Sequence, residues 1–188
     1  GRAAFFDHIL RTTRKLLVEA PTDIKLAIAL VYACVSGSGK TVSMLMLKSR
    51  IPDDLKHSTF VAYLGFNCGM LLNSEEEDHI QRYCKKGAME VLARRLLASV
   101  LISKNNPESV CQTCKYEDVY SKQVFPSVEQ SKTALIRSLD CSPSKRVAIV
   151  AGIDEVQLLS RVQVAPEQVS LGRFFLRTLR PWQLEWWG

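Results

Sequence analysis

The segment Ser36-Gly37-Ser38-Gly39-Lys40-Thr41 decides how this chain of 188 residues is expected to fold. Residues 26–32 lie just before it and form a continuous apolar run, which is typical of a strand buried on both faces of a parallel sheet. Residues 41–50 are predicted to form a helix that ends before Pro52. A glycine turn between a buried strand and a helix gathers backbone N–H groups at the positive end of the helix dipole. The segment therefore favours binding of an anion such as phosphate.

Each residue type in this segment has a chemical role in holding a nucleotide and its magnesium ion. The glycines permit the backbone angles that let N–H groups converge on phosphate oxygens. Lys40 brings a point charge to the outer phosphates, and the Thr41 hydroxyl is a ligand for Mg²⁺. The predicted nucleotide-binding residues are Ser36, Gly37, Ser38, Gly39, Lys40, Thr41 and Val42. A glycine turn without a ligand is the alternative, and Cys34 stands where the usual pattern begins with glycine.

A second acidic motif follows another apolar run. Residues 147–151 are predicted to form a buried strand, and Asp154 and Glu155 come shortly after it. A carboxylate at the carboxyl end of such a strand is suited to bind Mg²⁺, and we assign this role to Asp154 together with Thr41. Glu155 is the candidate catalytic residue, because a neighbouring carboxylate can orient or deprotonate an attacking water. The alternative for this pair is a solvated turn after a strand.

Further elements are predicted from hydrophobic periodicity and capping signals. Residues 60–66 read as a strand, and residues 4–19 read as an amphipathic helix. A long helix is predicted from a capping box with Ser74 at the N-cap, and it continues to about residue 102 with an interruption at Gly87. We expect Asn67 and Gln157 near the carboxyl edge of the sheet, as phosphate sensors or as ordinary surface residues.

Two more helices complete the predicted pattern. Ser127 begins a second capping box, and that helix should run to about residue 139. Pro166 suits the first turn of the last helix, and Pro181 is expected to stop it. Strands alternating with helices predict an α/β fold with a parallel sheet between two helical layers. We divide the chain into a helical lead-in, residues 1–24, and one domain, residues 25–188.

The paired motifs resemble the Walker A and Asp-Glu Walker B sequences of P-loop NTPases, in particular the AAA-type and signal-transduction NTPases. Residues 63–67 and 154–159 also look like the NTPase modules of Crinkler and retrotransposon-hot-spot proteins. The resemblance implies a three-layer α/β/α P-loop NTPase fold. It also implies a strand after the Walker B unit, which carries a polar sensor residue and inserts between the first and third strands. Only residues 181–188 follow the last predicted helix, so we expect a domain truncated before the sensor strand.

Composition and charge indicate which partners and which cellular compartment to expect for this chain. The formal net charge is +6, and the basic residues are scattered, which predicts a solvated surface and supports nucleic acid only weakly as a partner. Six cysteines without framework spacing predict reduced thiols in an intracellular compartment, either cytoplasm or nucleus. The pair Cys111 and Cys114 is an incidental loop pair or half of a zinc site. No signal peptide or transmembrane segment is expected.

The main functional hypothesis is Mg²⁺-dependent binding and slow hydrolysis of ATP by a partial P-loop NTPase. ATP is preferred over GTP because the sequence contains no Asn-Lys-x-Asp motif, which reads guanine in the related GTPases. The alternative is a nucleotide-gated interaction module with little or no hydrolysis and an unknown protein partner. A motor driven by nucleic acid is a third hypothesis, and none of the three involves a membrane.

Overall fold

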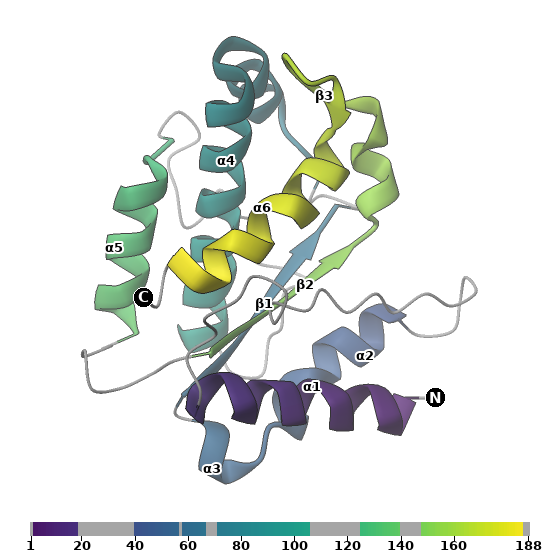
Figure 1. Cartoon of the computed structure of the whole chain (residues 1–188), viewed down its shortest axis with the longest axis vertical. Helices are drawn as coiled ribbons and strands as arrows, with labels where there is room; N and C mark the ends of the chain where they lie inside the picture. The colour runs from purple at the N-terminus through teal and green to yellow at the C-terminus, as the bar shows by residue number, and fades with distance from the viewer. Residues whose placement is uncertain are drawn as a thin grey trace.

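The computed structural model describes residues 2–18, 40–56, 58–66, 71–105, 125–139 and 148–185. These residues form a mixed α/β arrangement around a pair of parallel strands (Figure 1). The elements before the first strand are α1 (Arg2–Val18), α2 (Lys40–Leu47), the 3-10 turn η2 (Lys48–Arg50) and α3 (Asp53–Lys56). The apolar run of residues 26–32 lies outside the described residues.

The strand pair is formed by β1 (Thr59–Gly65) and β2 (Ala148–Asp154), which run parallel in a register that joins Thr59 to Ala148 and Gly65 to Asp154. Both strands were predicted from their apolar runs, and both are confirmed. β2 extends to Asp154, so the carboxylate is the last residue of the strand and not part of a following turn. Because the strands are parallel, their carboxyl ends lie at one edge of the pair.

Helices cover both faces of the strand pair, as Figure 1 shows. Alternate strand residues point to opposite faces. Val61 and Val150 pack with residues of α1, α2 and α3 on one face. Ala62 and Leu64 pack on the other face, in the larger core built by α4 (Ser74–Asn105), α5 (Val128–Ser138) and α6 (Leu171–Glu185). Helices therefore pack against both faces of the pair, although β2 is only partly buried and Ala151 is exposed.

The outer edge of β1 is closed by a side chain of α4. The Tyr63 N–H donates to the Ser99 hydroxyl at 2.7 Å, and that hydroxyl donates to the Tyr63 carbonyl at 3.0 Å. The N–H and C=O of one strand residue point to the same side, so these two groups of Tyr63 face away from β2. A bonded edge cannot accept another strand at that point.

The long helix α4 breaks at Cys84, three residues before the predicted interruption at Gly87. Cys84 has φ 52° and ψ −126°, which lie outside the helical region. The short arm (residues 74–83) and the long arm (residues 85–105) then lie against each other. An added Cβ on Gly87 would come 2.4 Å from the His79 carbonyl oxygen, so the glycine serves this close approach.

A buried ion pair joins the two arms of α4. The Arg95 guanidinium donates to both carboxylate oxygens of Glu76, at 2.9 and 2.5 Å, and to the Leu71 carbonyl at 2.9 Å. Nineteen residues of straight helix would separate the pair by about 28 Å. Arg94 and Arg95 are each 2% exposed, so the expectation that the scattered arginines are solvated is wrong for these two. Arg95 also stacks over the Phe66 ring, which offsets part of the cost of burying its charge.

Two capping boxes begin helices, one of them displaced from its predicted position. The Ser127 box of α5 is confirmed, with the Gln130 N–H donating to the Ser127 hydroxyl and the Gln130 side chain accepting from the Ser127 N–H. For α4 the cap is Asn73, not Ser74, because the Asn73 side chain accepts from the Glu76 N–H at 2.8 Å. The Glu76 carboxylate accepts from the Asn73 N–H in return, at 3.2 Å.

The two predictions made from proline near the carboxyl end are wrong. After β2 come a 3-10 helix, η4 (Val156–Arg161), and a short antiparallel pair, β3 (Gln163–Val164) and β4 (Val169–Ser170). Pro166 lies in the turn between β3 and β4, and α6 begins five residues later. α6 also continues through Pro181, since a proline removes a single N–H donor and can be accommodated within a helix.

Candidate functional site

The candidate site lies at the carboxyl edge of β1 and β2, where Asp154 ends β2. Asp154 is 8% exposed, and each of its carboxylate oxygens accepts a hydrogen bond. The Tyr63 hydroxyl donates to Oδ2 at 2.8 Å, and the Glu155 N–H donates to Oδ1 at 3.0 Å. These donors fix the rotation of the carboxylate.

Tyr63 reaches Asp154 because of the strand register. Tyr63 lies opposite Gly152, and Asp154 is two residues further along β2 on the same face. A diagonal neighbour of this kind is within reach of an aromatic side chain, and Gly152 places no side chain between them. Gly152, an irregularity in an otherwise apolar strand, is the register partner of Tyr63. Tyr63 lies in the segment of residues 63–67 that carries the resemblance described above, but no role was assigned to it from the sequence.

Glu155 begins the turn that leaves β2. Its backbone is left-handed, with φ 57° and ψ 34°, and its carbonyl accepts from the Leu158 N–H at 2.9 Å as η4 begins. The Gln157 side-chain amide donates to the Glu155 carboxylate. The candidate catalytic carboxylate is thus beside Asp154 in the chain but held by Gln157, a residue that we expected near this edge.

The predicted nucleotide-binding residues fall largely outside the described residues. Ser36 to Gly39 are not described, and neither is Asn67. α2 begins at Lys40, directly after the Gly-Ser-Gly sequence, as predicted. Lys40 and Thr41 are described as backbone of its first turn, and Val42 is half exposed.

α2 covers the same face of the strand pair to which Asp154 belongs. Leu47 of α2 packs with Val61 and, at the margin of the same cluster, Val150. Strand periodicity places Tyr63 on the face of Val61, and Asp154 on the face of Val150. The helix that follows the glycine turn and the predicted Mg²⁺ ligand therefore share one side of the sheet.

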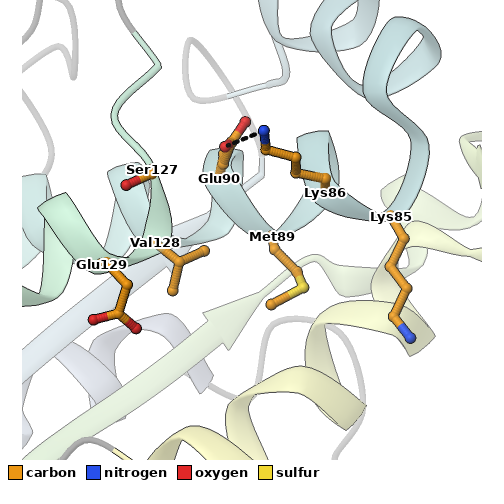
Figure 2. Close-up of a pocket in the computed structure, with 7 residues that line it drawn as sticks. All are labelled: Lys85, Lys86, Met89, Glu90, Ser127, Val128 and Glu129. Carbon is orange, nitrogen blue, oxygen red and sulfur yellow. Dashed lines mark ion pairs between the residues drawn. The ribbon is translucent and has the colours of Figure 1, made fainter.

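A shallow depression of about 490 Å³ lies between α4 and α5, away from this edge (Figure 2). Met89 and Val128 supply its apolar surface, and Lys86 lies 3.9 Å from Glu90 at one side. The Glu90 carboxylate is also 2.8 Å from His79 Nε2, and His79 stacks on the Phe125 ring. These contacts give His79 a structural role that joins the arms of α4 to the segment before α5.

Other sequence-based candidates gain no support from the described residues. No group of three or more potential metal-ligating side chains occurs within the described ranges. Cys84 is a free thiol, whereas Cys111 and Cys114 lie outside the part of the chain that the structure describes. Among the described helices, none combines the length and the apolar character needed to cross a membrane.

Comparisons with protein-family models, with curated proteins and with solved structures found no match to this chain.

Proposed function

We propose that the chain binds a nucleoside triphosphate, ATP by preference, together with Mg²⁺, and hydrolyses it slowly. Lys40 and the backbone of residues 36–42 hold the phosphates, Thr41 and Asp154 hold the ion, and Glu155 orients the water. Mg²⁺, when bound, neutralises charge on the phosphates and fixes their position.

The observation that carries the proposal is the position of Asp154. A buried carboxylate ends β2, at the edge where ligands bind in open α/β sheets, and it lies on the face covered by the helix that begins at Lys40. A hard oxygen ligand held by two donors suits Mg²⁺, which is commonly bound through one or two carboxylates plus phosphates and water. Asp154 alone is therefore sufficient as the carboxylate ligand that the protein supplies to the ion.

The strand order supports a P-loop NTPase fold of three layers, with the strand of residues 26–32 in the same sheet. β1 and β2, the predicted second and third strands, are parallel neighbours here. Because Ser99 closes the outer edge of β1, additional strands would join the sheet beside β2. That arrangement would bring the glycine turn to the same edge as Asp154.

The test is equilibrium binding of a fluorescent ATP analogue with and without Mg²⁺. Lys40→Ala should weaken binding by about 10-fold or more, because a hydrogen bond to a charged group contributes about 1.5–3 kcal/mol. Asp154→Asn should remove the Mg²⁺-dependent part alone. Lys56→Ala is the matched control, since it removes an exposed lysine that pairs with Asp53 on α3. Absence of saturable binding by the folded unmodified chain, or equal binding by Lys40→Ala, rejects the proposal.

A nucleotide-gated module that hardly hydrolyses is the second candidate, and the contact between Gln157 and Glu155 favours it. A carboxylate that accepts from a neighbouring amide is restrained from turning toward a water. Gln157→Ala should then raise the hydrolysis rate while nucleotide affinity stays constant. An unchanged or lower hydrolysis rate in Gln157→Ala would mean that the contact with Gln157 does not restrain Glu155.

A further inference from the structure

Tyr63, which lies opposite Gly152, contributes a hydrogen bond to the carboxylate of the proposed metal site. Tyr63 is 2% exposed, and its hydroxyl donates to Asp154 Oδ2 at 2.8 Å in a region from which water is excluded. A hydrogen bond to an ionised acceptor is stronger than one between neutral groups, and low exposure strengthens it further.

The backbone of Tyr63 is fixed independently of its side chain. Ser99 of α4 bonds to both the N–H and the carbonyl of Tyr63, and the register with Gly152 sets its height along β2. The position of the Tyr63 backbone is therefore fixed by Ser99 on one side of β1 and by pairing with β2 on the other, and the phenol group projects from this backbone. Such a donor can hold a carboxylate in one rotamer rather than follow its movements.

The two donors to Asp154 come from different parts of the chain. The Glu155 N–H is local and would accompany any aspartate at the end of this strand. Tyr63 belongs to the neighbouring strand and fixes the carboxylate relative to the sheet. Together the two contacts hold the Asp154 carboxylate in one orientation relative to the sheet.

We infer that Tyr63 is a positioning residue, which orients the Asp154 carboxylate toward the Mg²⁺ of the bound nucleotide. This inference rests on the proposed function and gives a role to a residue to which the sequence motifs assigned none. Tyr63 acts through Asp154 and does not touch the ion. Partners of metal-binding carboxylates of this kind typically change metal affinity by about 10- to 100-fold when they are removed.

The experiment measures nucleotide binding as a function of Mg²⁺ concentration. Tyr63→Phe removes the hydroxyl and retains the buried ring, so the Mg²⁺ concentration at half-saturation should rise about 10- to 100-fold. Binding measured in EDTA should stay unchanged, which a general loss of structure would not allow. Thr59→Val is the control, because it changes another buried residue of β1 and leaves the bond between Tyr63 and Asp154 in place.

A comparison of single and double variants tests the role of Tyr63 even if Tyr63→Phe lowers the stability of the chain. In an Asp154→Ala background, Tyr63→Phe should leave nucleotide affinity at a fixed, high Mg²⁺ concentration unchanged, because the group that it orients is gone. An equal effect in both backgrounds overturns the inference, as does an unchanged Mg²⁺ midpoint in Tyr63→Phe. Failure of the unmodified chain to bind nucleotide with Mg²⁺ overturns the proposed function, and this inference with it.

Discussion

Replacing Gly87 by alanine separates the effect of helix propensity from the effect of tertiary contact, because the two have opposite signs. In an isolated or straight helix, Gly→Ala raises stability by about 1 kcal/mol. In this structure the new Cβ would lie 2.4 Å from the His79 carbonyl oxygen and 3.1 Å from two further backbone atoms. Backbone atoms cannot turn aside as a flexible side chain can, so the arms of α4 must move apart.

The magnitude follows from the two opposing terms. Overpacking a tight contact costs about 1–3 kcal/mol, and a backbone contact justifies the upper end of that range. After subtraction of about 1 kcal/mol for propensity, the free energy of unfolding should fall by about 2 kcal/mol. For a chain of this size the melting temperature should then drop by about 4–8 °C.

The assay is urea unfolding followed by circular dichroism at 222 nm, with melting curves as a second measurement. Thr133→Ala is the control, because Thr133 is exposed in the middle of α5 and the change should add a few tenths of a kcal/mol through propensity alone. A rise in stability of about 1 kcal/mol for Gly87→Ala would refute the close packing of the two arms.

Changes at three further places in the structure test other parts of the fold by chemical denaturation. Cys84→Gly should stabilise the chain by about 1 kcal/mol, because relief of a strained backbone outweighs the entropy of an added glycine. Glu76→Ala should cost about 3–5 kcal/mol by leaving Arg95 buried without its carboxylate, and the pair Glu76→Leu with Arg95→Met should cost less. Thr59→Val should add about 1 kcal/mol, because the buried hydroxyl has no hydrogen-bond partner among the described residues.

Each of these predictions has an outcome that contradicts it. A loss of stability in Cys84→Gly would mean that the helix does not break at residue 84. A cost for the double change equal to the sum of the costs of Glu76→Leu alone and Arg95→Met alone would mean that Glu76 and Arg95 do not interact. Destabilisation by Thr59→Val would mean that the hydroxyl is bonded in solution.

Local signals in the sequence predicted the elements that depend on local physics. The apolar runs located β1 and β2, and the Ser127-x-x-Gln130 pattern located the start of α5, because a capping box closes within four residues. The same pattern is ambiguous at the start of α4, where Asn73 and Ser74 are both good caps and each has a glutamate three residues later. The structure selects Asn73, because its partner Glu76 also pairs with the buried Arg95.

The helix boundaries predicted from proline and glycine were wrong where contacts between distant residues determine the local structure. Pro166 precedes an amphipathic stretch and so suggested a helix start, yet the pairing of β3 with β4 places it in a turn. Gly87 suggested a helix break, but its lack of a side chain serves packing against His79. The break itself occurs at Cys84, a residue type that gives no local signal for a left-handed backbone.

The sequence by itself determined the chemistry of the candidate site: a glycine turn followed by Lys40 and Thr41, and an Asp154-Glu155 pair after a buried strand. Residue type and spacing carry that information because phosphate and Mg²⁺ require particular donors in a particular order. Only the tertiary structure decided that Tyr63 bonds to Asp154, that Ser99 closes the edge of β1, and that Arg94 and Arg95 are buried. These contacts join residues 19 to 91 positions apart, and strand register and helix packing, not local propensity, bring them together.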